Sequence, residues 1–163
     1  MKRRREPETA KIDSLTHDGR GIAAIAGKKV FVPGALPGEE VRILRRKIRR
    51  GHDEADLLEV LKPSAERVVP RCEVFGICGG CALQHIDAAD QRQMKQKSLK
   101  DSLERIGGVS AERWLPPVFD ESGENSWQYR RRARLAVRDV AAKGRVLVGF
   151  KERGAAMVTD MHR

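Results

Sequence analysis

The sequence predicts a mainly β protein with one long helix, in which a small β-barrel is followed by a small α+β domain. Three observations predict this fold class. Short apolar runs separated by glycine and proline turns fill residues 11–63. One stretch with helical start and stop signals covers residues 87–106. Residues 128–140 alternate arginine with apolar side chains. We expect a basic, disordered N-terminus at 1–10 and the second domain at 64–163.

Short strands joined by tight turns account for the first domain. The expected strands are 12–15, 22–25, 30–32, 40–48 and 55–61. In the longest of them, Val41, Ile43 and Arg45 share one face, because side chains alternate along a strand. Five short strands in so small a segment suit a closed or partly closed barrel, and the oligonucleotide-binding type is a common form of it.

A linker and a helix follow the barrel. The linker is bounded by Pro63 and Pro70 and leads into a loop rich in cysteine and glycine. Asp87 is the expected N-cap of the helix, and Gly107-Gly108 is expected to end it. An approximate apolar stripe predicts that the helix packs against the cysteine-containing loop. The stripe consists of Met94, Leu99, Leu103 and Ile106.

A second, smaller sheet is expected after a loop at 114–126. The two-residue period places a ladder of guanidinium groups on one face of the strand 128–140. The ladder consists of Arg130, Arg132, Arg134 and Arg138, and the opposite face carries Tyr129, Ala133, Leu135 and Val137. A turn at Lys143-Gly144 and strands at 146–150 and 155–159 would complete an antiparallel sheet.

The charge of the chain favours a polyanionic partner. Lys and Arg total 33 against 23 Asp and Glu, which gives a formal net charge of +10. Two basic runs, 41–50 and 128–138, contain apolar but no acidic residues, so we expect them to contact phosphates. The candidates are Arg42, Arg45, Arg46, Lys47, Arg49 and Arg50 in the first run and Arg130, Arg132 and Arg134 in the second. Phe31 and Tyr129 are candidates for base stacking, although core packing is the more common role of such residues.

The three cysteines of the chain predict a metal centre. They are Cys72, Cys78 and Cys81. Their odd number, and the absence of an apolar signal segment behind Met1, indicate a reducing, cytoplasmic setting in which disulfides are not expected. Glycines free the backbone between them, so several thiolates can bind one iron–sulfur cluster or zinc ion. No apolar run reaches the roughly 20 residues of a membrane-spanning helix, and we expect no membrane association.

Taken in order, these features resemble the N-terminal half of the ribosomal-RNA uracil-5-methyltransferases, the RlmD/RumA-like enzymes. The matching features are a small barrel, Cys72-x5-Cys78-Gly-Gly-Cys81, the run 83–85 of Leu-Gln-His, a lysine-rich helix and the run 129–134 of Tyr-Arg-Arg-Arg-Ala-Arg. The resemblance extends from about Lys11 to the end of the chain. In that family the barrel is a TRAM domain that grips RNA, so the resemblance implies ribosomal RNA as the partner. We also expect a monomer in the cytoplasm.

The resemblance also implies a cofactor. It makes Cys72, Cys78 and Cys81 three of the four ligands of a [4Fe-4S] cluster, and the fourth ligand would follow the part matched by 157–163. The family's S-adenosylmethionine site, catalytic cysteine and general base lie in a C-terminal domain with no counterpart here. The resemblance therefore implies a fragment or a truncated product, with S-adenosylmethionine bound only by the full-length enzyme. We expect no catalytic residue in this chain, and no methyltransferase activity from it alone.

Two alternatives stay open. The first is an RNA-binding module without enzymatic activity, in which Cys72, Cys78, Cys81 and His85 hold a tetrahedral zinc ion. The second is a radical enzyme, since some of these enzymes combine a TRAM domain with a three-cysteine cluster. In those enzymes three residues separate the first two cysteines and the TRAM domain follows the cluster, whereas here five residues separate Cys72 from Cys78 and the barrel comes first.

Overall fold

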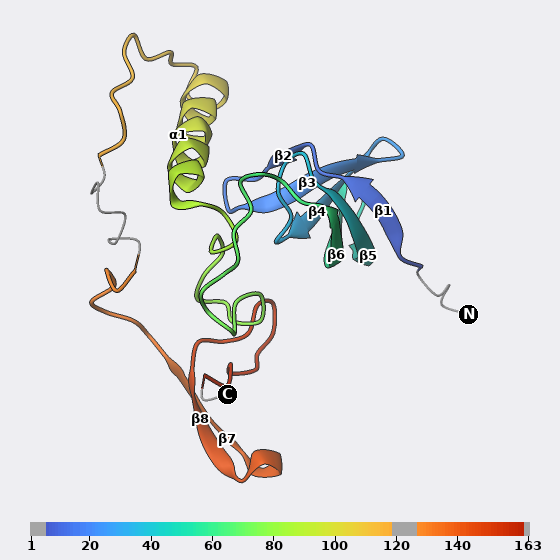
Figure 1. Ribbon diagram of the computed structural model, residues 1–163, viewed down its shortest axis with the longest axis vertical. Coiled ribbons are helices and arrows are strands. Elements are labelled where there is room, and N and C mark those ends of the chain that lie inside the picture. The colour runs from blue at the N-terminus through green and yellow to red at the C-terminus, as the bar shows by residue number, and fades with distance from the viewer. Residues whose placement is uncertain (1–5, 119–126, 162–163) are drawn as a thin grey trace. The chain divides into compact units, whose positions relative to one another are not determined.

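The structure is a computed structural model that describes residues 6–118 and 127–161 (Figure 1). The chain divides into two compact units. Of the described residues, the barrel unit comprises 6–68 and 85–110, and the loop unit comprises 69–84, 111–118 and 127–161. Strands and one α-helix make up the regular structure, which confirms the predicted fold class. The helix groups with the barrel, whereas we had expected it in the second domain.

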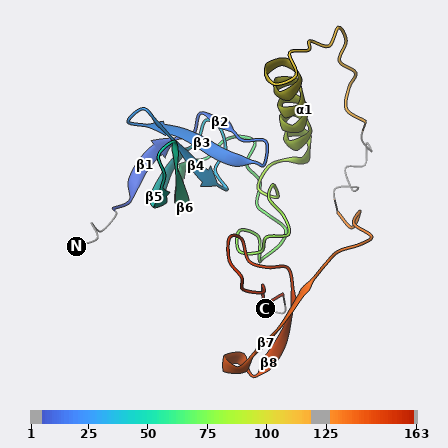
Figure 2. The same cartoon turned by 180° about the vertical axis from the view of Figure 1, so that it is seen from behind.

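A six-stranded, curled sheet forms the barrel unit, and its curl is visible from the front and from behind (Figure 1 and Figure 2). Its strands are β1 (Glu8–Lys11), β2 (Ser14–Leu15), β3 (Arg20–Ile25), β4 (Lys28–Pro33), β5 (Glu40–Ile48) and β6 (His52–Lys62). Their order is β1-β5-β6-β4-β3-β2. All pairs are antiparallel except β4 with β6, which run parallel. This half-barrel confirms the predicted barrel of the oligonucleotide-binding type.

Small and branched apolar side chains fill the inside of the curled sheet. The buried cluster consists of Ala10, Ile12, Ala23, Val30, Val32, Ala35, Val41, Ile43 and Ala55. They alternate with exposed or half-buried residues, as strands with one covered face require. Gly21 belongs to this inner face, where an added Cβ would lie 2.9 Å from the carbonyl oxygen of Ala35. A side chain at this position would therefore collide with the backbone of Ala35.

The first strand begins earlier than expected. Residues 8–10 fall in the segment predicted to be disordered, but Glu8–Lys11 pairs antiparallel with β5 as β1. The physical reason is an ion pair that the sequence pattern does not show. The Glu8 carboxylate receives two hydrogen bonds from Arg45, of 2.5 Å from Nε and 3.1 Å from Nη2, and so joins the two strands.

A buried ion pair attaches the linker to the barrel. Glu39 is fully buried, and its Oε1 lies 2.5 Å from Nε of Arg67. Its Oε2 accepts hydrogen bonds from Nη2 of Arg67, at 2.8 Å, and from the backbone of Leu36, at 2.8 Å. Arg67 also donates to the carbonyl oxygen of Gly34 at 2.7 Å. Burial alone would raise the pKa of Glu39, but these hydrogen bonds outweigh it and hold the pKa below its ordinary value.

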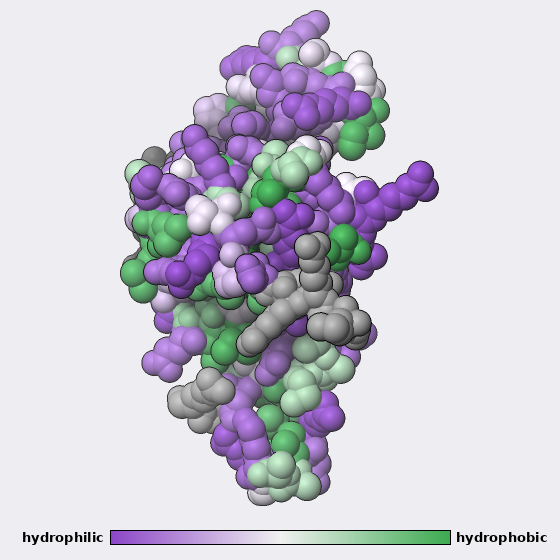
Figure 3. All heavy atoms as spheres, turned by 90° about the vertical axis from the view of Figure 1, so that its right-hand side faces the viewer, coloured by the Kyte–Doolittle hydropathy of each residue, from purple (hydrophilic) through white to green (hydrophobic). Residues whose placement is uncertain are grey.

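The helix α1 (Ala88–Arg105) has the predicted limits. Asp87 caps it by accepting a hydrogen bond of 2.8 Å from the Ala89 amide. No residue of α1 is buried, however, and Leu99 is 54% exposed. The packing of the apolar stripe of α1 against the cysteine-containing loop stays a prediction. Most residues of α1 are polar or charged, and hydrophilic side chains predominate on the face of the molecule that Figure 3 shows. Among the described residues, no helix is long and apolar enough to cross a membrane.

The loop unit contains a short hairpin in place of the expected sheet. The hairpin pairs β7 (Ala136–Val140) with β8 (Arg145–Gly149) through the 3-10 turn η2 (Ala141–Lys143). Two predictions are wrong here. Residues 128–135 form no strand, because β8 supplies partners only for residues 136–140. Residues 155–159 form no strand either, although a single bridge joins Lys151 to Val158.

Candidate nucleic-acid interface and cysteine loop

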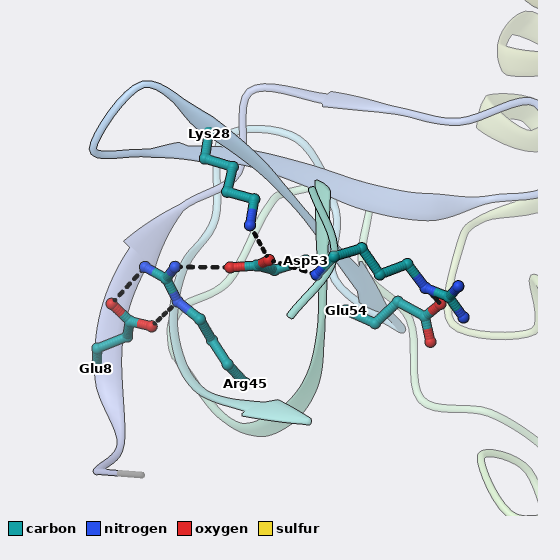
Figure 4. Close-up of polar contacts among 6 residues, drawn as sticks. Glu8, Lys28, Arg45, Asp53 and Glu54 are labelled. Atoms are coloured by element: carbon teal, nitrogen blue, oxygen red, sulfur yellow. Dashed lines mark hydrogen bonds and ion pairs between the residues drawn. The ribbon is translucent and has the colours of Figure 1, made fainter. Parts of the chain in front are cut away.

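Arg45 differs from the other basic residues of β5, because it lies inside an ion network (Figure 4). Its side chain is 22% exposed. Besides Glu8, its guanidinium contacts Asp53, with Nη1 2.8 Å from Oδ2. Figure 4 shows the two carboxylates on either side of this guanidinium. A phosphate would have to displace both carboxylates to bind Arg45. Arg45 therefore serves to join β5 to its neighbours β1 and β6.

Asp53 is the buried centre of that network. It is 1% exposed, and its Oδ1 lies 2.5 Å from Nζ of Lys28. The backbone amide of Arg49 donates a further hydrogen bond of 3.3 Å. Burial would raise the pKa of Asp53, but the hydrogen bonds from Lys28 and Arg45 outweigh it and lower the pKa below its ordinary value. Asp53 is therefore ionised in the folded barrel and joins β4, β5 and β6.

The exposed basic residues of β5 face acidic residues of β6. Arg42 pairs with Glu59 at 2.7 Å and Arg46 with Asp56 at 3.3 Å. Glu54 lies 2.9 Å from Lys47 and 3.5 Å from Arg49. The sequence pattern did not reveal these pairs. The run 41–50 itself contains no acidic residue, and its acidic partners lie on the antiparallel neighbour β6. Arg50 lies at the β5–β6 turn. It makes no ion pair with an acid in the described part of the chain.

Of the predicted ladder, Arg130, Arg132 and Arg134 lie ahead of β7, in an exposed segment without regular structure, whereas Arg138 lies in β7. Arg130 lies over the rings of Tyr129 and Phe150, with its guanidinium carbon 5.9 Å from each ring centre. Arg132 and Arg134 make no ion pair with any acid in residues 6–118 or 127–161. These arginines form no ladder on a strand, but they are more accessible to an anion than the paired side chains of β5.

Neither aromatic candidate packs in a core. Tyr129 is 66% exposed. Phe31 is half-buried on the outer face of β4, opposite the buried side chains of Val30 and Val32. The guanidinium carbon of Arg20 lies 4.9 Å from its ring centre, and the ring of His52 lies at 5.0 Å. The expectation of core packing is therefore wrong for both. The alternation along β4 turns Phe31 outward, and Tyr129 lies in an exposed segment without regular structure.

The cysteine loop, residues 72–81, is held against the segment that follows β8. Cys78 is buried and forms an isolated bridge with Glu152. The Gly79 amide donates to the carbonyl oxygen of Lys151 at 2.9 Å, and Arg153 donates from Nη2 to the carbonyl oxygen of Cys81 at 2.6 Å. These contacts fix both the buried and the exposed end of the Cys-Gly-Gly-Cys run.

The two glycines of this run are required by close packing. A Cβ at Gly79 would lie 2.8 Å from the carbonyl oxygen of Lys151. A Cβ at Gly80 would lie 2.8 Å from Cδ2 of Phe150. Side chains at these positions would therefore push the loop away from its support. Gly79 and Gly80 thus fit closely against Phe150 and Lys151, the two residues that follow β8.

The structure does not gather the predicted metal ligands. Cys72 is half-buried and Cys81 is exposed. Within the described ranges, no three side chains among His, Cys, Asp and Glu are placed to hold a metal ion. His85, the fourth ligand of the zinc alternative, is buried. Both ligand sets stay predictions.

Comparison with known proteins gives a consistent result for the whole chain. Residues 9–65 match the family described as the tRNA (uracil(54)-C(5))-methyltransferase TRAM domain. The chain is 50% identical over 156 residues to the 23S rRNA (uracil(1939)-C(5))-methyltransferase RlmD of Nitrosococcus oceani. This alignment covers 96% of this chain and 34% of that protein. RlmD of Alkalilimnicola ehrlichii is 46% identical over 98% of this chain and 35% of its own length. RlmD of Acidithiobacillus ferrooxidans is 48% identical over 96% of this chain and 34% of its own length.

The chain thus spans about a third of the length of the curated relatives that it matches. The similarity includes both the barrel and the cysteine loop, since it covers nearly every residue. The predicted resemblance to the N-terminal part of the ribosomal-RNA (uracil-5-)methyltransferases of the RlmD type is confirmed.

Proposed function

We propose that this chain is the RNA-holding N-terminal portion of an S-adenosylmethionine-dependent 23S rRNA uracil-5-methyltransferase. The observation that carries the proposal is the similarity to RlmD proteins across 92–98% of the chain. The TRAM match over residues 9–65 supports RNA binding by the barrel. The proposal assigns no catalytic residue to this chain. Methyl transfer to carbon 5 of uracil also needs a nucleophile, a bound methyl donor and a base, which the proposal assigns to the remaining part of the enzyme.

The proposal gives the exposed arginines the main phosphate contacts. A cation that already pairs with a carboxylate must break that pair before it can bind a phosphate, so its net gain is small. Arg132 and Arg134 have no such pair with a described acid, and Arg130 contacts the rings of two described residues, Tyr129 and Phe150. We therefore rank Arg130, Arg132 and Arg134 above Arg42, Arg46 and Lys47 as phosphate contacts.

A paired set of variants tests this ranking. Replacing Arg130, Arg132 and Arg134 together by Gln is expected to weaken binding to all RNA sequences alike. Each lost phosphate contact should also reduce the slope of log affinity against log salt by about one unit. The matched control replaces Arg42, Arg46 and Lys47 by Gln and should change the slope less, because these residues are paired with acids of β6. Fluorescence anisotropy with a labelled structured RNA, titrated with potassium chloride, measures both slopes.

Two results would contradict the proposal. If the wild-type chain shows no salt-dependent RNA binding, the chain does not hold RNA. If the control variant loses more slope than the first variant, RNA binds along β5 and the ranking is wrong.

We further propose that Cys72, Cys78 and Cys81 supply three of the four ligands of a [4Fe-4S] cluster in the complete protein. Soft thiolates suit iron–sulfur ligation, and the Gly80 amide donates a hydrogen bond of 3.4 Å to the sulfur of Cys78, of the kind that stabilises a ligated thiolate. Metal binding commonly completes the folding of small loops, so the cluster would draw together thiols that the protein alone leaves apart. Its role would be to fix the loop beside the exposed arginines. Thiolates bound to iron are not free to act as nucleophiles.

Anaerobic reconstitution tests this cofactor. We expect the chain to take up iron and sulfide and turn brown, and Cys78→Ser to lose most of that iron. Gly80→Ala should lower the retained iron, because its Cβ displaces the loop from Phe150. Gly51→Ala is the matched control, since a Cβ at Gly51 meets nothing within 4 Å. Stoichiometric zinc in a colourless protein, lost in His85→Ala, would favour the Cys3His alternative. The absence of both metals, with three freely alkylated thiols, would reject both.

A further inference from the structure

A row of ring and guanidinium groups lies on the outer face of the barrel. The register pairs Arg20 with Pro33, Ile22 with Phe31 and Lys29 with His52, so their side chains share one side of the sheet. The alternate residues of the same strands are buried. The outer face is here defined as Arg20, Phe31 and His52, with Lys29 beside them.

Phe31 is the central ring of this face, and a side chain from each neighbouring strand contacts it. The Arg20 guanidinium carbon lies 4.9 Å from the Phe31 ring centre. His52 lies 5.0 Å from it, with the two ring planes inclined by 48°. The Arg20 side chain is itself fixed, because its Nε donates a hydrogen bond of 3.1 Å to Asp18. The Arg20 guanidinium is therefore held over the ring before any ligand arrives.

Negative charge near this face is already compensated. Glu54 is the residue that pairs with Phe31 across the strands, and its carboxylate contacts Lys47 and Arg49. The hydrogen bond from Lys47 lowers the pKa of Glu54, so this carboxylate stays ionised and bound to its partners. Two exposed basic residues lie nearby. Lys29 belongs to β4, which pairs with β6, and Arg50 lies at the β5–β6 turn. The face thus combines aromatic surface with an excess of positive charge.

We propose that the outer face binds an unpaired RNA nucleotide, whose base stacks on the row of Arg20, Phe31 and His52. This inference rests on the proposed function and specifies it. Aromatic rings and guanidinium planes bind the π-face that every base has, and such stacking tolerates any sequence. The bases of a duplex are stacked on one another and offer no free face. The site therefore selects single-stranded loops or bulges over double-stranded RNA, and the phosphate of the bound nucleotide lies near Lys29.

Phe31→Leu tests the stacking site with little loss of apolar volume. Affinity for a single-stranded oligoribonucleotide is expected to fall by about fivefold to a hundredfold, and affinity for a duplex of the same length should not change. The salt slope should stay constant, because no charge is removed. Leu58→Ala is the control, since it removes an exposed apolar side chain of β6 that is not part of the row. Far-ultraviolet circular dichroism during heating checks that both variants are folded.

Crosslinking provides a second measurement on the unmodified protein. Single-stranded RNA that carries 5-iodouridine should give, under ultraviolet light, an adduct that mass spectrometry assigns to Phe31 or His52. Adducts confined to other residues, or wild-type affinity of Phe31→Leu for single-stranded RNA, would overturn the stacking site and leave the proposed function intact. If the wild-type chain binds neither RNA, the proposed function fails and the stacking site with it.

Discussion

Replacing Arg67 by Met is expected to destabilise the barrel unit by about 3 to 5 kcal/mol, which is the usual cost of breaking a buried ion pair on one side. The variant leaves the carboxylate of Glu39 fully buried with only its backbone hydrogen bonds, from Leu36 and Ser64. It also removes the hydrogen bond to Gly34. Urea unfolding followed by far-ultraviolet circular dichroism measures the change as a lower midpoint.

Two further variants identify the cause. Arg42→Met removes a pair in which both side chains are about half exposed, 52% and 49%, and should change the free energy of unfolding by less than about 1 kcal/mol. Combining Arg67→Met with Glu39→Gln also removes the buried negative charge that Arg67→Met leaves without a cation. The double variant should therefore lose less stability than Arg67→Met alone. Equal losses in Arg67→Met and Arg42→Met would show that the Glu39–Arg67 pair does not hold the linker on the barrel.

Replacing Asp53 by Asn is expected to cost about 2 to 3 kcal/mol of unfolding free energy at neutral pH. The amide keeps the shape of the side chain but loses the charge that accepts hydrogen bonds from Lys28 and Arg45. Arg45 keeps its contacts with Glu8, and both cations are about a quarter exposed, so the cost stays below that of Arg67→Met. Asp56→Asn on the same strand is the control, because its partner Arg46 is 67% exposed.

The pH dependence of stability provides an independent check. The pKa of Asp53 lies below its ordinary value of 3.8 because the hydrogen bonds from Lys28 and Arg45 outweigh burial, and the pKa of Glu39 lies below 4.5 for the corresponding reason. A carboxylate of this kind contributes its full stability above its unfolded pKa, and this stability is lost as the pH falls through the folded pKa. The wild-type barrel should therefore lose stability between about pH 5 and pH 2. The gap between wild type and Asp53→Asn should narrow over the same range, and a constant gap would contradict ionisation of Asp53 as its cause.

The strands were predictable where a two-residue period meets tight turns. The limits of the strand 40–48 were predicted as observed, and the helix begins and ends at its predicted signals, Asp87 and Gly107-Gly108. These features depend on neighbours in the sequence. The strand predicted at 128–140 is observed only at 136–140, because only these residues pair with β8. A strand needs a second strand for its hydrogen bonds, and periodicity does not supply one.

The candidate interface divides in the same way. The sequence indicated basic runs and two aromatic candidates, but it did not show that acids of β6 oppose the basic residues of β5. Nor did it indicate the Arg20–Phe31–His52 row, whose members come from three strands. A period-two analysis of β4 shows that Phe31 and Val30 face opposite sides, but only the depth of burial shows which side is the core. Pairing across strands is a long-range property, so it was available only from the fold.

By itself the sequence determined the fold class, the net positive charge, the cysteine cluster and the resemblance that the comparisons confirmed, because these depend on composition, local propensity and spacing. Only the tertiary structure decided which charges are neutralised, which aromatic ring faces outward, and why Gly79 and Gly80 must lack side chains. The physical reason is that ion pairs, ring contacts and steric limits act over a few ångströms between residues that lie far apart along the chain. Glu39 and Arg67 illustrate this: each is an ordinary surface-type residue in the sequence, and together they form the buried contact on which the linker depends.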